Sequence, residues 1–250
     1  MKEFIRRLLH DAVNFGLRLR SRSYVPAQDS RCVVIAPHQD DETLGCAGLI
    51  QAHRSANLPV TIIYITDGAG SHPNHPSLSP TAIASLRRAE AVRAMQQLQV
   101  ASDSLHFLDA PDGKLAQLTP ANAETLAQRL GPILATVQPT DLFLPCRDDG
   151  SSEHTAAFNL TQRALQVVSA RPRLLEYPVW AQWSPQRLIG PCLRCRRVWR
   201  LAFPTTVAIK RTALATYVSQ TEPTPPWPRP VLPAGFSRFF ETDEEYFFER

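Results

Sequence analysis

The sequence predicts an α/β fold, a Rossmann-like and mostly parallel sheet with helices on both faces, formed by a single domain. Short apolar runs alternate with longer segments of helical periodicity along most of the 250 residues, which is the pattern of repeated βαβ units. Runs such as residues 32–37 and 60–66 are apolar throughout, and this favours strands that are buried on both faces. Hydrophobic residues make up 44% of the chain, enough for a sizeable core.

Each predicted element follows from its local pattern. Strands are expected over residues 32–37, 60–66, 105–108, 141–145 and 174–180, where short runs are apolar or β-branched. Helices are expected over residues 43–55, 81–98, 122–137 and 153–169. Residues 68–80 are rich in Gly, Pro, Ser and His and predict a loop, and residues 111–113 predict a turn.

The two ends of the chain differ from this pattern. We expect three parts: an N-terminal amphipathic helix and linker over residues 1–30, an α/β domain over residues 31–221 that carries any catalytic groups, and a C-terminal tail over residues 222–250. The tail is first Pro-rich, then aromatic and acidic, and is expected to pack back onto the domain. The helix has two interpretations. It packs on the domain or on a partner subunit, which we favour, or residues 1–24 contact an anionic membrane surface peripherally.

Charge and composition exclude several classes of protein. The net charge is only +4 and no basic stripe with a recognisable module is present, so we expect no nucleic-acid partner. No apolar run is long enough to span a membrane. Five cysteines, an odd number, favour a reduced protein in the cytoplasm over a disulfide scaffold, with a place at the inner membrane surface if the N-terminal helix binds lipid.

Polar and charged side chains follow four of the predicted strands, and open α/β sheets bind ligands at these strand ends. They are His38 to Glu42, then Asp67 with His72 and His75, then Asp112, and finally Asp148, Asp149 and His154. Only seven histidines occur in the chain, so their concentration at strand ends indicates chemistry.

The first of these clusters predicts a metal site. His38 and Asp41 are three residues apart where a strand turns into a helix, so both side chains can face one point, and imidazole with carboxylate suits zinc. The third ligand is either a histidine of the 72–75 loop or His154, and we favour His154 because it opens a helix after a buried strand. Asp40 can take the proton from a metal-bound water.

The run from Pro37 to Glu42, Pro-His-Gln-Asp-Asp-Glu, resembles the signature of the PIG-L/LmbE-like de-N-acetylase family, where His-Pro-Asp-Asp-Glu is usual. Four further segments, residues 65–68, 87–90, 108–113 and 141–154, recur in the order of the family, as does a run over 210–220. The resemblance implies zinc ligands at His38, Asp41 and His154, with one Zn²⁺ per chain, and a general base at Asp40.

By the same resemblance, Arg87 and Asp112 match positions that hold the sugar. Asp67, His72, His75 and Ser151 complete the predicted substrate-binding residues, with His72 and His75 as residues of a substrate loop or, alternatively, as solvated histidines. The implied reaction is hydrolysis of the N-acetyl group of an N-acetylglucosamine-type glycoconjugate, which yields a free amine and acetate. An open His-Asp-His site also accepts Fe²⁺ or Co²⁺.

Two positions depart from the family pattern. Gln39 replaces a proline that supplies no ligand. The later motif, commonly His-Pro-Asp-His, here reads Ser151-Ser-Glu-His154, so the ligand is kept and the first histidine is lost. That histidine assists the transition state in relatives, and replacement by His72 or His75 from the loop is a hypothesis.

Other functions remain as alternatives. The chain contains neither G-x-G-x-x-G nor G-x-S-x-G, so a nucleotide-dependent dehydrogenase and a serine hydrolase are excluded. A zinc amidohydrolase for a non-sugar amide and a catalytically impaired, metal-retaining binding protein of the same fold are the two alternatives that we keep.

Overall fold

The structure is a computed structural model that describes residues 2–250, with side chains from Phe4 onward. Of the predicted N-terminal helix, Met1 lies outside the described residues. The strands are β1 (Ser21–Ser23), β2 (Cys32–Ala36), β3 (Val60–Thr66), β4 (Leu105–Ala110), β5 (Asp141–Pro145), β6 (Arg173–Tyr177), β7 (Arg197–Ala202) and β8 (Glu244–Glu249). The α-helices are α1 (Lys2–Arg20), α2 (Asp41–Ser55), α3 (Pro80–Gln97), α4 (Pro120–Val137), α5 (Ser152–Gln166), α6 (Trp180–Trp183), α7 (Ile189–Arg194), α8 (Val207–Leu214) and α9 (Val218–Thr221).

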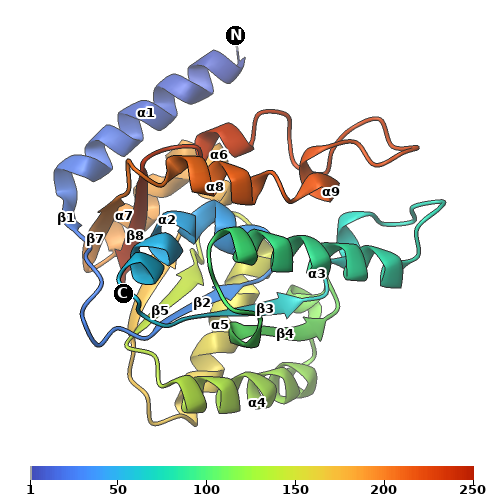
Figure 1. The fold of residues 1–250 in the computed structure, drawn as a ribbon, viewed down its shortest axis with the longest axis horizontal. Coiled ribbons are helices and arrows are strands. Elements are labelled where there is room, and N and C mark those ends of the chain that lie inside the picture. The colour runs from blue at the N-terminus through green and yellow to red at the C-terminus, as the bar shows by residue number, and fades with distance from the viewer. Residues whose placement is uncertain (1) are drawn as a thin grey trace.

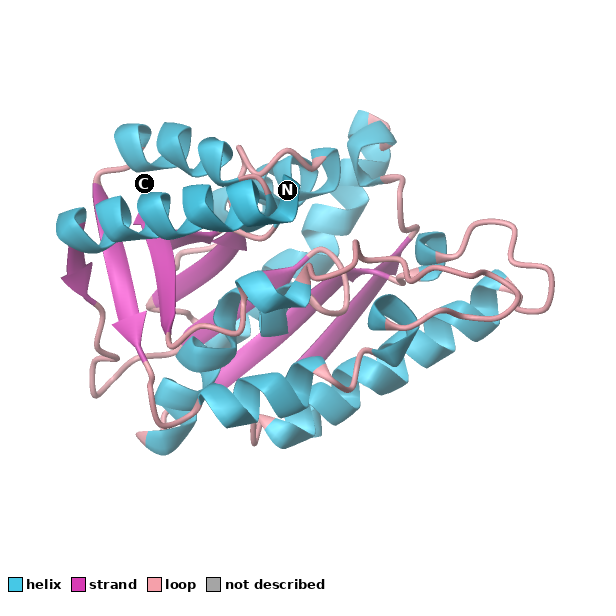
Figure 2. Cartoon of the chain, turned by 90° about the horizontal axis from the view of Figure 1, so that it is seen from above, coloured by secondary structure: helices cyan, strands magenta, loops and turns pink. Residues whose placement is uncertain are grey.

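The strands form one eight-stranded sheet in the order β1-β7-β8-β6-β5-β2-β3-β4. The pairs on either side of β2 and β5 are parallel, and β8 runs antiparallel to both of its neighbours. Figure 2 shows the strands as one twisted layer with helices on either side. This arrangement confirms the predicted α/β fold with a mostly parallel sheet.

Helices cover both faces because the central strands are apolar on both. In β2, Val34 packs into the core beneath α2, α3 and α8, and its neighbour Val33 packs into the core of α4 and α5. Figure 1 shows these two groups of helices on opposite sides of the sheet. A strand without polar alternation is stable only in such a doubly covered position, as the sequence predicts.

The C-terminal part of the sheet differs from the sequence predictions. Residues 178–180 were expected to extend a strand, but β6 ends at Tyr177 and Trp180 begins the short helix α6. The strands β1 and β7 were not predicted. Residues 244–249, expected only to pack back onto the domain, form β8 between β6 and β7.

The acids of β8 are compatible with an interior strand because each has a partner. Glu245 is buried, lies 2.8 Å from Lys210 Nζ and accepts hydrogen bonds from the backbone N–H groups of Gly48 and Leu49. Glu249 accepts a hydrogen bond of 2.7 Å from the indole N–H of Trp199. Buried carboxylates that are paired in this way avoid most of the cost of desolvation.

Candidate active site

The predicted metal ligands meet where the strand order reverses. From β2 the chain proceeds outward through β3 to β4, and it then returns to β5 on the other side of β2. Open parallel sheets bind their ligands at this switch point, outside the carboxyl ends of the strands. His38 and Asp41 follow β2, and His154 lies in the first turn of α5, directly after β5.

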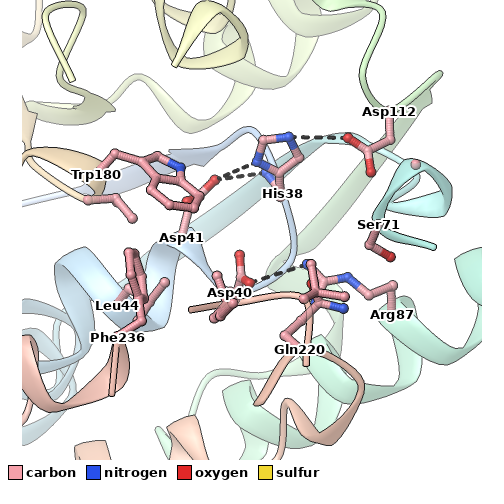
Figure 3. A pocket seen from close by; sticks show the side chains of 14 residues that line it. His38, Asp40, Asp41, Leu44, Ser71, Arg87, Asp112, Trp180, Gln220 and Phe236 are labelled. Atoms are coloured by element: carbon pink, nitrogen blue, oxygen red, sulfur yellow. Dashed lines mark hydrogen bonds and ion pairs between the residues drawn. The ribbon is translucent and has the colours of Figure 1, made fainter. Parts of the chain in front are cut away.

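Asp41 lies between the two histidines. Its Oδ2 is 3.1 Å from His38 Nδ1, and its Oδ1 is 3.4 Å from His154 Nε2. The ligand atoms of the three residues all lie within 4.8 Å of one another. Figure 3 shows the His38 ring at the pocket, with Asp41 on one side and Asp112 on the other.

The donors at this point fit a divalent cation. His154 Nε2 is buried and has no hydrogen-bond partner among the described residues. Burial disfavours charge on both histidines, but the nearby carboxylates outweigh it and raise the pKa of His38 and, to about 9, that of His154. Burial also acts against charge on Asp41, yet the two histidines hold its pKa well below the usual range. The cluster therefore favours positive charge, and its imidazole and carboxylate donors are those of three-ligand zinc sites.

Asp149 fixes the orientation of His154 and was given no role in the sequence predictions. Its Oδ2 lies 2.7 Å from His154 Nδ1. The same carboxylate accepts hydrogen bonds from the backbone N–H groups of Val179, Trp180 and Ala181. Metal-bound histidines commonly donate their second ring N–H to a carboxylate, which directs the other nitrogen at the metal. The sequence signal for this role was the pair of acids, Asp148 and Asp149, that follows the predicted strand over residues 141–145.

Asp40 faces Arg87 across the pocket floor. Asp40 Oδ2 lies 3.4 Å from Arg87 Nη2, and both side chains are buried. Burial raises the pKa of the Asp40 carboxyl to about 6, the neighbouring Asp41 adds to this rise, and Arg87 opposes it. Arg87 Nε and Nη1 are buried without hydrogen-bond partners in the described part of the chain. The pair therefore combines a carboxylate of raised basicity with unused donors.

Glu42 supports the backbone of this motif from below. Its Oε2 accepts a hydrogen bond of 3.1 Å from the Asp40 N–H, and its Oε1 accepts from the hydroxyl groups of Thr43 and Tyr217. Burial raises the pKa of Glu42 to about 7. The acid that follows the two aspartates thus holds the turn that presents Asp40.

Asp112 and Glu153 lie on the other side of His38. His38 Nε2 is 3.2 Å from Asp112 Oδ1 and 3.6 Å from Glu153 Oε2, and these three residues form a second grouping of potential ligands. Glu153 already accepts the backbone N–H groups of Gly113 and Leu115, however, so its carboxylate holds the loop that carries Asp112. His154 Nε2 accepts and donates no hydrogen bond among the described residues, and this makes the first grouping the better candidate metal site.

A cavity of about 200 Å³ opens above these residues, with a polar and an apolar side (Figure 3). The polar side is formed by His38, Asp40, Asp41, Gly70, Ser71, Arg87, Asp112 and Gln220. The apolar side is formed by Leu44, Val179, Trp180, Val231, Leu232 and Phe236. Three of these apolar residues come from the C-terminal segment that was expected only as a covering tail.

Four predicted substrate residues do not line this cavity. Asp67 accepts hydrogen bonds from the N–H groups of Ala69 and Asp112, and so joins two loops. The Ser151 hydroxyl accepts the His154 N–H at 3.3 Å and caps α5. The rings of His72 and His75 lie against Trp227. The positions of these four residues give no support to the predicted contact with substrate.

Several solved structures resemble the chain. An N,N'-diacetylchitobiose deacetylase from Pyrococcus horikoshii is 20% identical over 89% of this chain and 80% of its own, with a TM-score of 0.58. A triple mutant of a deacetylase of the teicoplanin biosynthetic pathway is 17% identical over 88% and 97%, with a TM-score of 0.65. The hydratase GalB from Pseudomonas putida, which acts on 4-carboxy-2-hydroxymuconate, is 16% identical over 84% and 82%, with a TM-score of 0.62. At such identities the likeness establishes the shared fold.

No curated protein matches the sequence. The family model described as PIG-L, GlcNAc-PI de-N-acetylase, matches residues 33–165, more than half of the chain. This match covers all three of the predicted metal ligands, and it confirms the resemblance and the enzyme class, a deacetylase, that the sequence predicts. The chain belongs to the PIG-L family.

Proposed function

We propose that the protein is a zinc-dependent hydrolase that removes the N-acetyl group from an N-acetylglucosamine-type sugar conjugate. The observation that carries this proposal is the convergence of His38, Asp41 and His154 beside Asp40 at the floor of one cavity. Family membership supports the reaction class. Of the two deacetylases of the same fold, one is named for N,N'-diacetylchitobiose and the other belongs to the teicoplanin biosynthetic pathway.

His38, Asp41 and His154 would hold the metal. When bound, zinc would polarise the amide carbonyl and make a water molecule more acidic. The chain's own contribution is to fix the donors: Asp149 directs Nε2 of His154 into the site, and the start of α2 holds Asp41 between the two rings. An arrangement held by hydrogen bonds in this way needs little reorganisation on metal binding.

Asp40 is the proposed general base. Its carboxylate lies on the cavity wall next to the ligands without being required as a ligand, and its raised pKa increases its affinity for the proton of the attacking water. It would carry that proton to the departing amine. Arg87 orients the carboxylate and keeps two further donors for substrate oxygens.

The two sides of the cavity support a sugar substrate. Asp112, Ser71 and Gln220 offer polar groups for hydroxyls, and Trp180 offers an aromatic side chain opposite them. Aromatic rings that contact one face of a ligand while polar groups fix its edge are typical of small-molecule sites. The position of the histidine that the family motif usually carries is filled by Ser151, whose hydroxyl is used in the cap of α5.

The decisive experiment measures metal content together with acetate release. Protein stripped by a chelator is reloaded with Zn²⁺, Fe²⁺ or Co²⁺ and offered a panel of N-acetylglucosamine conjugates and N-acetylated non-sugar amines. Asp40→Asn should keep the metal and lose about 10²-fold or more in acetate release, as expected for removal of a general base. Asp103→Asn, an exposed acid outside the site, is the matched control.

The outcomes separate the alternatives. Acetate only from non-sugar amides would replace the sugar substrate by another amide. Stoichiometric metal without acetate from any substrate would favour an impaired, metal-retaining relative. A protein that binds no metal at all, or an Asp40→Asn variant of normal activity, would contradict the proposed mechanism.

A further inference from the structure

We propose that α1 docks the protein onto an anionic lipid bilayer through its outer face. This inference goes beyond the proposed hydrolysis and does not depend on it. It begins with the way in which α1 is attached. Figure 1 shows the helix along the outside of the fold, with the N-terminus at its far end.

The inner face of α1 is fixed to the domain. Leu17 is buried, and the His10 ring meets Phe239 edge-on at 5.0 Å between centroids. His10 Nε2 lies 3.1 Å from the side-chain oxygen of Gln182, and the Arg6 guanidinium lies 3.7 Å above the Trp183 ring. The helix therefore has a defined orientation, and its remaining face is presented outward.

That outer face is apolar. Large apolar side chains along it are between 50% and 73% exposed, and they are Phe4, Ile5, Leu8, Leu9, Phe15 and Leu19. Phe4, Leu8, Phe15 and Leu19 are separated by four, seven and four residues, so they form one stripe along the helix, which the exposed Asp11 interrupts between Leu8 and Phe15. Monomeric proteins seldom expose this many large apolar side chains on one helix without a binding partner.

The charge beside the stripe identifies the partner. Residues 1–24 contain six basic and two acidic side chains, a net charge of +4 that equals the charge of the whole chain. Residues 25–250 are balanced, with 21 basic and 21 acidic side chains. Arg7, Arg18 and Arg20 are exposed on α1 itself. An apolar stripe with adjacent arginines on a helix is the arrangement that binds anionic headgroups and the outer acyl region together.

A second copy of the chain fits this surface less well. Two such helices brought face to face would place two sets of arginines together, and like charges at an interface oppose association. A helix that spans the bilayer is not the explanation of the stripe either, because no helix among the described residues is long and apolar enough to cross a bilayer. A helix lying in the plane of an anionic membrane surface would bury the apolar stripe and place the arginines beside the headgroups.

Docking along α1 would bring the cavity close to the bilayer. Trp183, beneath Arg6, contacts Phe236 at 5.6 Å between ring centroids, and Phe236 lines the apolar side of the cavity. These two aromatic side chains therefore form a continuous chain of contacts from the inner face of α1 to the cavity.

Sedimentation of the full chain with vesicles tests the proposal. Vesicles of phosphatidylcholine alone are compared with an equimolar mixture of phosphatidylcholine and phosphatidylglycerol, at low and high salt. The protein should sediment with the mixed vesicles only, and less at high salt because screening weakens the attraction. Leu8→Asp should weaken this binding about tenfold or more. The control Val167→Asp also replaces an exposed aliphatic side chain by an acid, but at the end of α5, and it should not weaken the binding.

Three results would overturn the proposal. The first is no sedimentation with the mixed vesicles, and the second is equal weakening by Leu8→Asp and Val167→Asp. The third is a wild type that is dimeric without vesicles and becomes monomeric in Leu8→Asp, which would assign the stripe to a second copy. Circular dichroism of each variant shows that the fold is intact, and the site at the switch point is untouched by either substitution.

Discussion

Two pairs of histidines lie near the cavity, and both pairs are largely buried, yet their surroundings are opposite. The rings of His38 and His154 are 5.9 Å apart and are surrounded by carboxylates. The rings of His72 and His75 are also 5.9 Å apart, but both pack against Trp227. The spacing of histidines alone therefore does not indicate a metal site. The acids around His38 and His154 are what distinguish this candidate site from the second pair.

The second pair, His72 and His75, joins two loops, and we call these two residues with Thr224 and Trp227 the clasp. The His72 ring stacks on Trp227 at 5.3 Å and 16°, and its Nε2 lies 3.1 Å from the Thr224 hydroxyl. His75 Nδ1 accepts the N–H groups of Ser77 and Leu78. Burial lowers the pKa of His72, whereas the carboxylates around His38 and His154 raise the pKa of those two histidines. These contacts hold the loop after β3 to the Pro-rich segment that ends in the cavity wall.

The largest expected effect follows from loss of a proposed ligand at the switch point. His154→Ala should lower metal affinity by about a hundredfold or more, since removing even a supporting partner of a ligand costs up to that amount. Turnover should fall with the metal. The measurement is metal content after dialysis, with acetate release from the same sample.

His53→Ala is the matched control for His154→Ala. His53 is equally buried, but it bonds to Ser30 and to the Leu49 carbonyl, away from the site. It should lower the free energy of unfolding by about 1 kcal/mol or more and leave the metal in place. Equal metal loss in both variants would show that unfolding, rather than ligation, was measured.

A smaller effect is expected for the residue that orients His154. Asp149→Asn should reduce metal affinity about 10- to 100-fold, because the amide holds the His154 ring less firmly and in no fixed tautomer. The neighbouring Asp148→Asn removes ion pairs with Arg194 and Arg250, neither of which touches His154, and should leave metal affinity unchanged. Metal titration of the two variants side by side decides this, and equal affinities would remove the role of Asp149.

The histidines of the clasp should matter for stability more than for chemistry. His72→Ala and His75→Ala should each lower the free energy of unfolding by about 1 kcal/mol, through lost packing on Trp227, with metal content and turnover near wild type. A fall in turnover of about a hundredfold with the metal retained would instead show that one of them assists the transition state. Thermal unfolding and acetate release separate these results.

The smallest effect is expected at the position where the family motif usually has a histidine. Ser151→Ala removes the cap of α5 and should cost about 1 kcal/mol of stability, with little change in turnover. Denaturant unfolding measures the first and acetate release the second. A large loss of turnover at unchanged stability would place the Ser151 hydroxyl at the substrate.

Much of the fold and the centre of the site were predictable because the responsible patterns are local. The apolar runs that became β2, β3 and β5 are buried on both faces, as their lack of alternation predicts. His38 and Asp41 lie three residues apart at a strand-to-helix junction, a geometry that sequence spacing determines. His154 was predictable from its place after a buried strand.

The rest depended on contacts between distant segments. The strand β8 is aromatic and acidic. It can lie inside the sheet because Lys210 and Trp199, from distant segments, are partners for its acids. Three residues of the cavity wall belong to the C-terminal segment, and the clasp joins residues 72–75 to residues 224–227.

The sequence by itself determined the α/β layering, the placement of candidate metal ligands at strand ends and the charge of the N-terminal helix, because periodicity, short spacing and composition are properties of neighbouring residues. The tertiary structure decided which of the strand-end side chains meet, which histidines became a clasp, and which face of α1 stays exposed. These depend on strand order and on packing between segments far apart in the chain, and no local pattern encodes either.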